Sequence, residues 1–70
     1  MELANATNSL DRPAGMDLRL RRVEAGVSQS DLARRLGVSR QRVGNLERMY
    51  RPGRTAAERY LAALAELAGQ

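Results

Sequence analysis

A chain of 70 residues has room for one small hydrophobic core and not for two. The absence of cysteine and histidine excludes a disulfide framework and removes both the commonest metal ligand and the usual neutral-pH proton shuttle. Twelve basic residues, all arginine, outnumber eight acidic ones, for a net charge of +4 and a pI near 11.0. Guanidinium groups suit phosphate and base-edge recognition, so nucleic acid is a candidate partner, with a solvated basic surface as the alternative.

No constellation in the sequence predicts an enzyme. There is no nucleophile with a nearby base, no carboxylate pair near a pocket and no phosphate-cradling glycine loop. We therefore expect no catalytic activity and no metal or cofactor.

Residues 1–12 mix small polar residues with two isolated leucines and show no helical or alternating period. This predicts an N-terminal arm ahead of a single domain at residues 13–70. The arm lacks the charged-then-apolar layout of a signal peptide, and no apolar run approaches the roughly 20 residues that cross a bilayer. The expected location is the cytoplasm, without membrane contact.

The first helical pattern begins with Pro13 in its first turn and runs to Ala25, where Gly26 ends it. Its apolar residues occupy two opposite faces at helical spacing. They are Ala14, Leu18 and Ala25 with the stem of Arg22 on one face, and Met16, Leu20 and Val23 on the other. Two apolar faces predict two neighbours, the core on one side and the arm or a second subunit on the other. Scattered exposed apolar side chains are the alternative.

A second helix is predicted to open at Ser28, where Asp31 three residues later completes a variant of the capping box. Gly37 supplies a left-handed turn, and Ser39 caps a third helix. Two short helices joined by a turn of about three residues predict a helix-turn-helix. The side chains expected to face the core from this pair are Leu32, Ala33, Leu36, Val43 and Leu46.

Residues 14–64 resemble the helix-turn-helix family of Cro and the phage repressors, also called the xenobiotic-response-element type. The matching elements are Leu18 with Arg19, Arg22, the segment GVSQSDLARRLGVS at residues 26–39, and the V-x-x-L-E pattern at residues 43–47. The resemblance implies an all-α, compact four-helix domain of lambda-repressor type. It also implies double-stranded DNA as the partner, with the third helix in the major groove.

Carried onto this sequence, the resemblance assigns base reading to Arg40, Gln41 and Asn45, with Gly44 leaving room between them. Arginine can pair bidentately with guanine, and glutamine or asparagine with adenine, each worth about 1–3 kcal/mol of discrimination. The four-residue spacings place these residues on one exposed helix face. An ordinary polar surface is the alternative.

Phosphate contacts are expected where helices start, because N–H groups are unpaired there, and in the basic loop after the third helix. The resemblance implies contacts at both places, and Arg42, on the flank of the third helix, could also reach the DNA backbone. The residues expected to contact phosphate are Gln29, Ser39, Arg42, Arg51 and Arg54.

A structural role is implied for two charged residues. In relatives, the residues at the positions of Arg22 and Glu47 resemble a partly buried ion pair that joins the first helix to the end of the reading helix. Breaking one partner of a buried pair costs about 3–5 kcal/mol. A substitution at either position would therefore weaken DNA binding by unfolding the domain.

The last helix is predicted to run from a cap at Thr55 to Gly69, with TAAE as a capping box. Its apolar stripe consists of Ala57, Tyr60, Leu61, Leu64, Leu67 and Ala68. Many relatives turn at a glycine after the position of Leu64 and add a fifth helix that makes the dimer contact, whereas this chain continues as a helix. The dimer contact is therefore expected on the last helix, or on the first helix with the arm.

These features predict a sequence-specific transcription regulator that binds double-stranded DNA as a homodimer and acts as a repressor. The alternative is a protein-interaction module, such as the antitoxin of a toxin–antitoxin pair, in which the arm or the second face of the first helix covers a toxin or co-regulator. A membrane-surface peptide is disfavoured, because Glu58 and Glu66 accompany Arg59 on the last helix and a packed core explains its apolar stripe.

Overall fold

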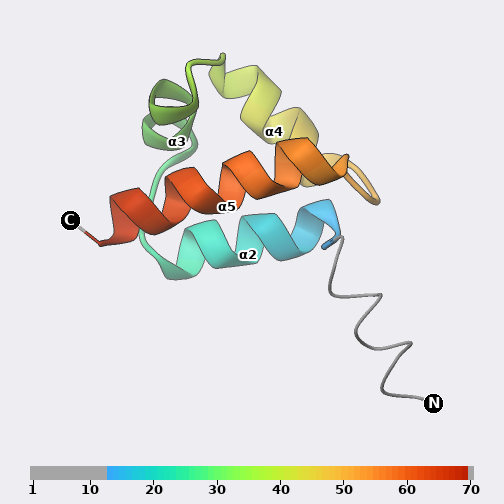
Figure 1. Ribbon diagram of the computed structural model, residues 1–70, viewed down its shortest axis with the longest axis horizontal. Helices are drawn as coiled ribbons and strands as arrows, with labels where there is room; N and C mark the ends of the chain where they lie inside the picture. The colour runs from blue at the N-terminus through green and yellow to red at the C-terminus, as the bar shows by residue number, and fades with distance from the viewer. Residues whose placement is uncertain (1–12, 70) are drawn as a thin grey trace.

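The computed structural model describes residues 13–69, and these form four helices and no strand. The helices are α2 (Gly15–Glu24), α3 (Gln29–Leu36), α4 (Arg40–Arg48) and α5 (Arg54–Ala68). Helices α2 and α5 lie side by side, and α3 and α4, joined by a tight turn, pack together against this pair (Figure 1). The predicted all-α four-helix architecture is confirmed, while the predicted arm at residues 1–12 lies outside the described residues.

The helix-turn-helix forms where its capping residues predict it. The Asp31 backbone N–H donates to the Ser28 hydroxyl oxygen at 3.0 Å, and the Arg42 N–H donates to the Ser39 hydroxyl oxygen at the same distance. Gly37 has a φ of 74°, a left-handed conformation that costs other residues strain. Helix α3 therefore ends at Leu36, and α4 begins at Arg40 in a new direction.

Two predicted helix starts are wrong. Helix α2 begins at Gly15 rather than at Pro13, because the Asp17 carboxylate accepts a hydrogen bond from the Ala14 N–H at 3.2 Å and fixes Ala14 as the cap. Helix α5 begins at Arg54 with Gly53 as its cap, so the predicted cap at Thr55 already lies in the first turn.

The core lies where α3 and α4 meet α2 and α5. Its buried apolar residues are Leu18, Leu32, Ala33, Val43, Leu46, Ala57, Tyr60, Ala63 and Leu64. Ala63 was not among the predicted core residues. Ala25 and Ala68, predicted to lie on apolar faces, are exposed, since each follows or ends its helix and the chain turns away from the core there.

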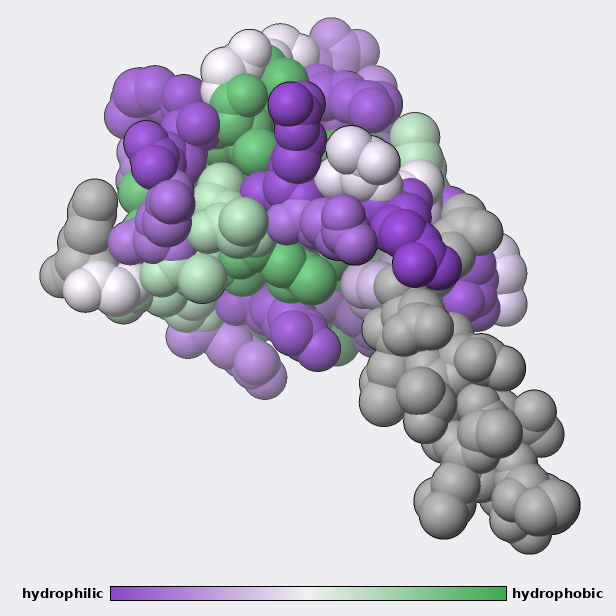
Figure 2. All heavy atoms as spheres, viewed as in Figure 1, coloured by the Kyte–Doolittle hydropathy of each residue, from purple (hydrophilic) through white to green (hydrophobic). Residues whose placement is uncertain are grey.

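The remaining surface is mixed. On the face that α5 presents, a band of hydrophobic surface is visible between hydrophilic residues (Figure 2). Among residues 13–69, no helix is both long enough and apolar enough to cross a membrane.

Candidate nucleic-acid interface

Helix α4 separates its side chains cleanly into an exposed and a buried set. Arg40, Gln41 and Asn45, the predicted base readers, are exposed. The buried residues of the same helix are Val43, Gly44, Leu46 and Glu47. The separation follows the helical period, because residues that face the core recur at intervals of three and four and leave the opposite face to solvent.

Arg48 adds a further exposed cation to this face. Its Nη2 donates to Asn45 Oδ1 at 2.8 Å, so two side chains one turn apart are joined on the surface of α4. Sequence reasoning assigned Asn45 to base reading and missed its pairing with Arg48.

The residues predicted to contact phosphate lie around α4 in two groups. Gln29 opens α3 and is half-buried, with its Nε2 donating to Glu47 Oε1 at 3.1 Å, while Ser39 and Arg42 belong to the first turn of α4. Arg51 and Arg54 are exposed in and after the loop that follows α4, where the Arg51 guanidinium lies 5.5 Å from the centre of a tyrosine ring. The structure thus brings cations to both ends of α4.

Arg19 is a cation of this region that sequence reasoning did not assign. It is exposed on α2, and together with Gln29 and Arg40 it lines one open depression between the starts of α3 and α4. The signal was present in the helical period, because Arg19 lies one turn before Arg22, whose side chain reaches the start of α3.

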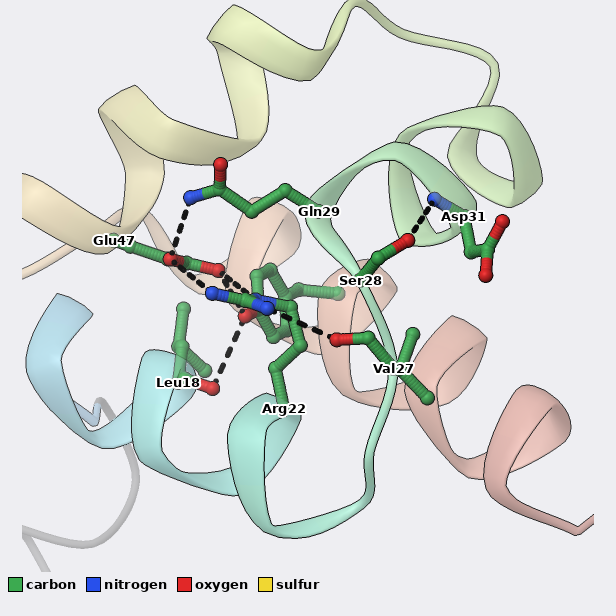
Figure 3. A network of polar contacts seen from close by, with 8 residues as sticks. Leu18, Arg22, Val27, Ser28, Gln29, Asp31 and Glu47 are labelled. Atoms are coloured by element: carbon green, nitrogen blue, oxygen red, sulfur yellow. Dashed lines mark hydrogen bonds and ion pairs between the residues drawn. The ribbon is translucent and has the colours of Figure 1, made fainter.

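A buried ion pair lies directly behind α4. Arg22 Nε donates to Glu47 Oε2 at 2.6 Å and Nη2 donates to Oε1 at 3.2 Å, with the two residues only 8% and 5% exposed. Arg22 Nη1 also donates to the Val27 carbonyl oxygen at 2.9 Å, in the segment before α3 (Figure 3). The fork geometry of the guanidinium therefore ties α2 to α4 and to the start of α3.

Tyr60 completes this network, although its sequence position suggested only an apolar core residue. Its hydroxyl oxygen lies 2.6 Å from Glu47 Oε2 and 3.0 Å from the Leu18 carbonyl oxygen. Since a hydroxyl carries one hydrogen, we assign its donation to the nearer and charged carboxylate. Within residues 13–69, no buried side-chain nitrogen or oxygen lacks a hydrogen-bond partner.

The network fixes the charge state of its members at neutral pH. Burial raises the pKa of Glu47, but hydrogen bonds from Arg22, Tyr60 and Gln29 together lower it by more, so the net pKa lies below its ordinary value. The hydrogen bond to Glu47 raises the pKa of Arg22. Burial is the largest cause that raises the pKa of Tyr60, and the hydrogen bond to Glu47 is the second. Glu47 is thus a carboxylate, Arg22 a cation and Tyr60 a neutral phenol.

The burial of Glu47 determines the charge of the exposed face of α4. The only acidic residue of α4 faces inward and is neutralised by Arg22, so the exposed face of α4 presents arginines and amides alone. Such a face can donate hydrogen bonds to base edges and attract phosphate. In the described part of the chain, no group of acidic residues could hold a metal ion.

Comparison with protein families shows one match. The Helix-turn-helix family model matches residues 18–68, which include α3, α4, α5 and most of α2. Comparisons with curated proteins and with solved structures gave no match.

Proposed function

Because the chain belongs to the Cro/C1-type helix-turn-helix family, whose members are DNA-binding transcription regulators, we propose that it reads a specific duplex sequence through α4 and acts as a dimeric repressor. The observation that carries this proposal is the exposed face of α4. It presents Arg40, Gln41 and Asn45 to solvent, while the single acid of the helix is buried against Arg22.

In this proposal α4 lies in the major groove, with its N-terminal half closest to the base edges. Arg40 and Gln41 follow the Ser39 cap and Asn45 comes one turn later, which is the order in which a recognition helix meets successive base pairs. Replacing Gln41 or Asn45 by alanine relaxes the base preference and leaves the fold intact, because neither side chain supports the core.

The phosphate contacts flank this helix. Gln29 uses one amide hydrogen on Glu47 and has a second to donate, and Ser39 accepts from Arg42 while its hydroxyl hydrogen can still donate. Arg42 supplies charge in the first turn of α4, and Arg51 and Arg54 supply it beyond the end of this helix. To these we add Arg19, which shares a depression with Gln29 and Arg40, as a sixth proposed phosphate contact.

The first test is enrichment of bound sequences from a random duplex library at about 150 mM salt, where nonspecific affinity is already reduced. A sequence-reading dimer enriches an inverted repeat with half-sites about 34 Å apart, or a multiple of that spacing. Salt-sensitive binding without any enriched sequence would contradict base reading by α4. Enrichment of a single half-site without a repeat would contradict the proposed dimer but support base reading by α4. Repression itself is checked by placing the recovered site over a reporter promoter.

A further inference from the structure

The exposed Arg48 guanidinium lies over the surface of α4, next to Gly44. A Cβ placed on Gly44 would lie 3.5 Å from Arg48 Nη1, 3.8 Å from Arg48 Nη2 and 3.7 Å from Gln29 Nε2. The guanidinium and the Gln29 amide therefore meet over the buried Gly44, beside the exposed residues of the proposed reading face. Side chains larger than alanine at position 44 would displace them.

The contact between Arg48 and Asn45 fixes the orientation of an amide. An arginine guanidinium has only donors, so the atom of Asn45 that it touches at 2.8 Å is the oxygen, Oδ1. The other end of the amide, the Nδ2 group with two hydrogens, is then left to face outward. The i,i+3 spacing on one helix brings the two side chains together without help from the DNA.

This orientation changes what Asn45 can recognise. Bidentate reading of adenine needs Oδ1 to accept from the base N6 amino group while Nδ2 donates to N7. One of the two lone pairs of Oδ1 accepts from Arg48, which turns Oδ1 toward the guanidinium and leaves Nδ2 as the group that faces outward, so Asn45 presents mainly hydrogens to a base. Guanine presents two acceptors, N7 and O6, in the major groove, whereas adenine presents a donor at the second position.

Resting on the proposed function, we infer that Arg48 is a specificity-determining residue that orients Asn45 as a donor, so that the base pair facing Asn45 is read as guanine rather than adenine. Arg48 reaches this role through Asn45, and it acts as a positioning residue. Its guanidinium also adds a donor beside the amide, which disfavours the adenine amino group further.

The test compares library enrichment for the wild-type chain and for Arg48→Met, which keeps the aliphatic stem and removes the donors. The position read by Asn45 is the one whose preference disappears in Asn45→Ala. The wild type should prefer guanine there, and Arg48→Met should shift the ratio toward adenine by about tenfold. Arg54→Met is the matched control, since it removes one charge from the interface and should weaken all duplexes without changing any base preference.

A second readout needs no DNA. The Asn45 side-chain amide resonances should move in Arg48→Met and stay in place in Arg54→Met, because Arg48 donates to that amide whereas Arg54 lies in the first turn of α5. A wild-type preference for adenine, or a preference at this position that Arg48→Met leaves unchanged, would overturn the inference while the proposed function stands. If the wild type enriches no sequence at all, the proposed function fails, and this inference with it.

Discussion

The Glu47 carboxylate on α4 accepts hydrogen bonds from Arg22 of α2, Gln29 of α3 and Tyr60 of α5. A buried carboxylate is stable only when its lone pairs are used, and here donors from the three other helices use them. The same group therefore serves as the point at which all four helices are fixed relative to one another. The orientation of the exposed face of α4 proposed to read bases depends on Glu47, although Glu47 itself lies on the opposite side of the helix.

Replacing Glu47 by glutamine should destabilise the domain by about 3–5 kcal/mol at neutral pH, because it leaves Arg22 buried without a counter-charge. The contribution of Glu47 to the free energy of unfolding should decrease as pH falls. The pKa of Glu47 is lowered by folding, so its contribution is complete above the unfolded-state value of about 4.3 and is lost as pH falls from there through the folded value. Urea unfolding at pH 7 and pH 3 measures both effects.

In this experiment the difference in unfolding free energy between wild type and Glu47→Gln should shrink at pH 3. Glu58→Gln on the exposed side of α5 is the control, and it should behave like wild type at both values. A difference between wild type and Glu47→Gln that stays constant across the range would show that the carboxylate is not the titrating partner of Arg22.

At the level of the helices, the caps and the periodicity predicted most of the fold. Ser28, Gly37 and Ser39 act locally, through atoms a few residues away, so their effect can be read from a short stretch of sequence. Tyr60 could not be placed in the same way. Its hydroxyl donates a hydrogen bond to Glu47, 13 positions earlier in the chain. Helical periodicity predicts that the side chain faces inward, but it does not identify the polar atom that the side chain will contact.

The same limit applies to the candidate interface. The exposure of Arg40 and Gln41 follows from the helical period, whereas the engagement of Gln29 by Glu47 depends on how α3 crosses α4. The start of α5 was misplaced because TAAE fits a capping box as well as Gly53 fits a cap. Local signals of similar strength are resolved only by the packing of the loop, where Pro52 is buried.

Gly15 shows how a single contact between helices sets their distance. Its N–H donates to the Met49 carbonyl oxygen at 3.0 Å, and a Cβ at this position would overlap the backbone carbonyls of Leu46 and Met49. Gly15→Ala should therefore destabilise the domain by about 1–3 kcal/mol, against the gain that alanine normally brings to a helix. Thermal unfolding measures the change.

Gly44→Ala is the matched control for this prediction, since it introduces the same methyl group into a helix where only the ends of flexible side chains are near. It should be neutral or stabilising by up to about 1 kcal/mol. Equal effects of the two substitutions would show that α2 and α4 can separate without cost at Gly15.

Considered as a whole, the molecule carries an excess of positive charge, and it places arginines from α2, α4 and the loop before α5 around one helix face. Such a distribution attracts DNA before any base is read, because each neutralised phosphate releases counterions. Affinity and sequence preference should therefore respond to different residues.

Arg54→Ala tests this separation. It should weaken binding to every duplex alike and reduce the slope of log affinity against log salt by about one unit, because one phosphate contact is lost. Arg21→Ala removes the same charge from an exposed position of α2 outside the proposed interface and should leave the slope close to its wild-type value. Titrations of one duplex at several salt concentrations supply both slopes, and an unchanged slope for Arg54→Ala would remove this residue from the phosphate set.

The proposed dimer requires an exposed apolar surface through which two copies can pair. In the described residues, three of the six large exposed hydrophobic side chains lie on α2, where Met16, Leu20 and Val23 are 55%, 52% and 55% exposed, and none lies on α5. The other three are Val38, Met49 and Tyr50, which lie outside the helices. Burial of apolar surface drives most protein association, so α2 is the better candidate for the dimer contact. Helix α5 offers mostly alanine and charged residues on its exposed side.

Leu20→Glu should therefore convert the dimer to a monomer, measured by sedimentation equilibrium, and should abolish the advantage of an inverted repeat over a single half-site. Ala62→Glu places the same charge on the exposed side of α5 and should leave both properties unchanged. The opposite result would move the dimer contact to α5. A wild-type chain that is monomeric at all concentrations would contradict the dimer and would favour the alternative of a module whose α2 face pairs with a toxin or co-regulator.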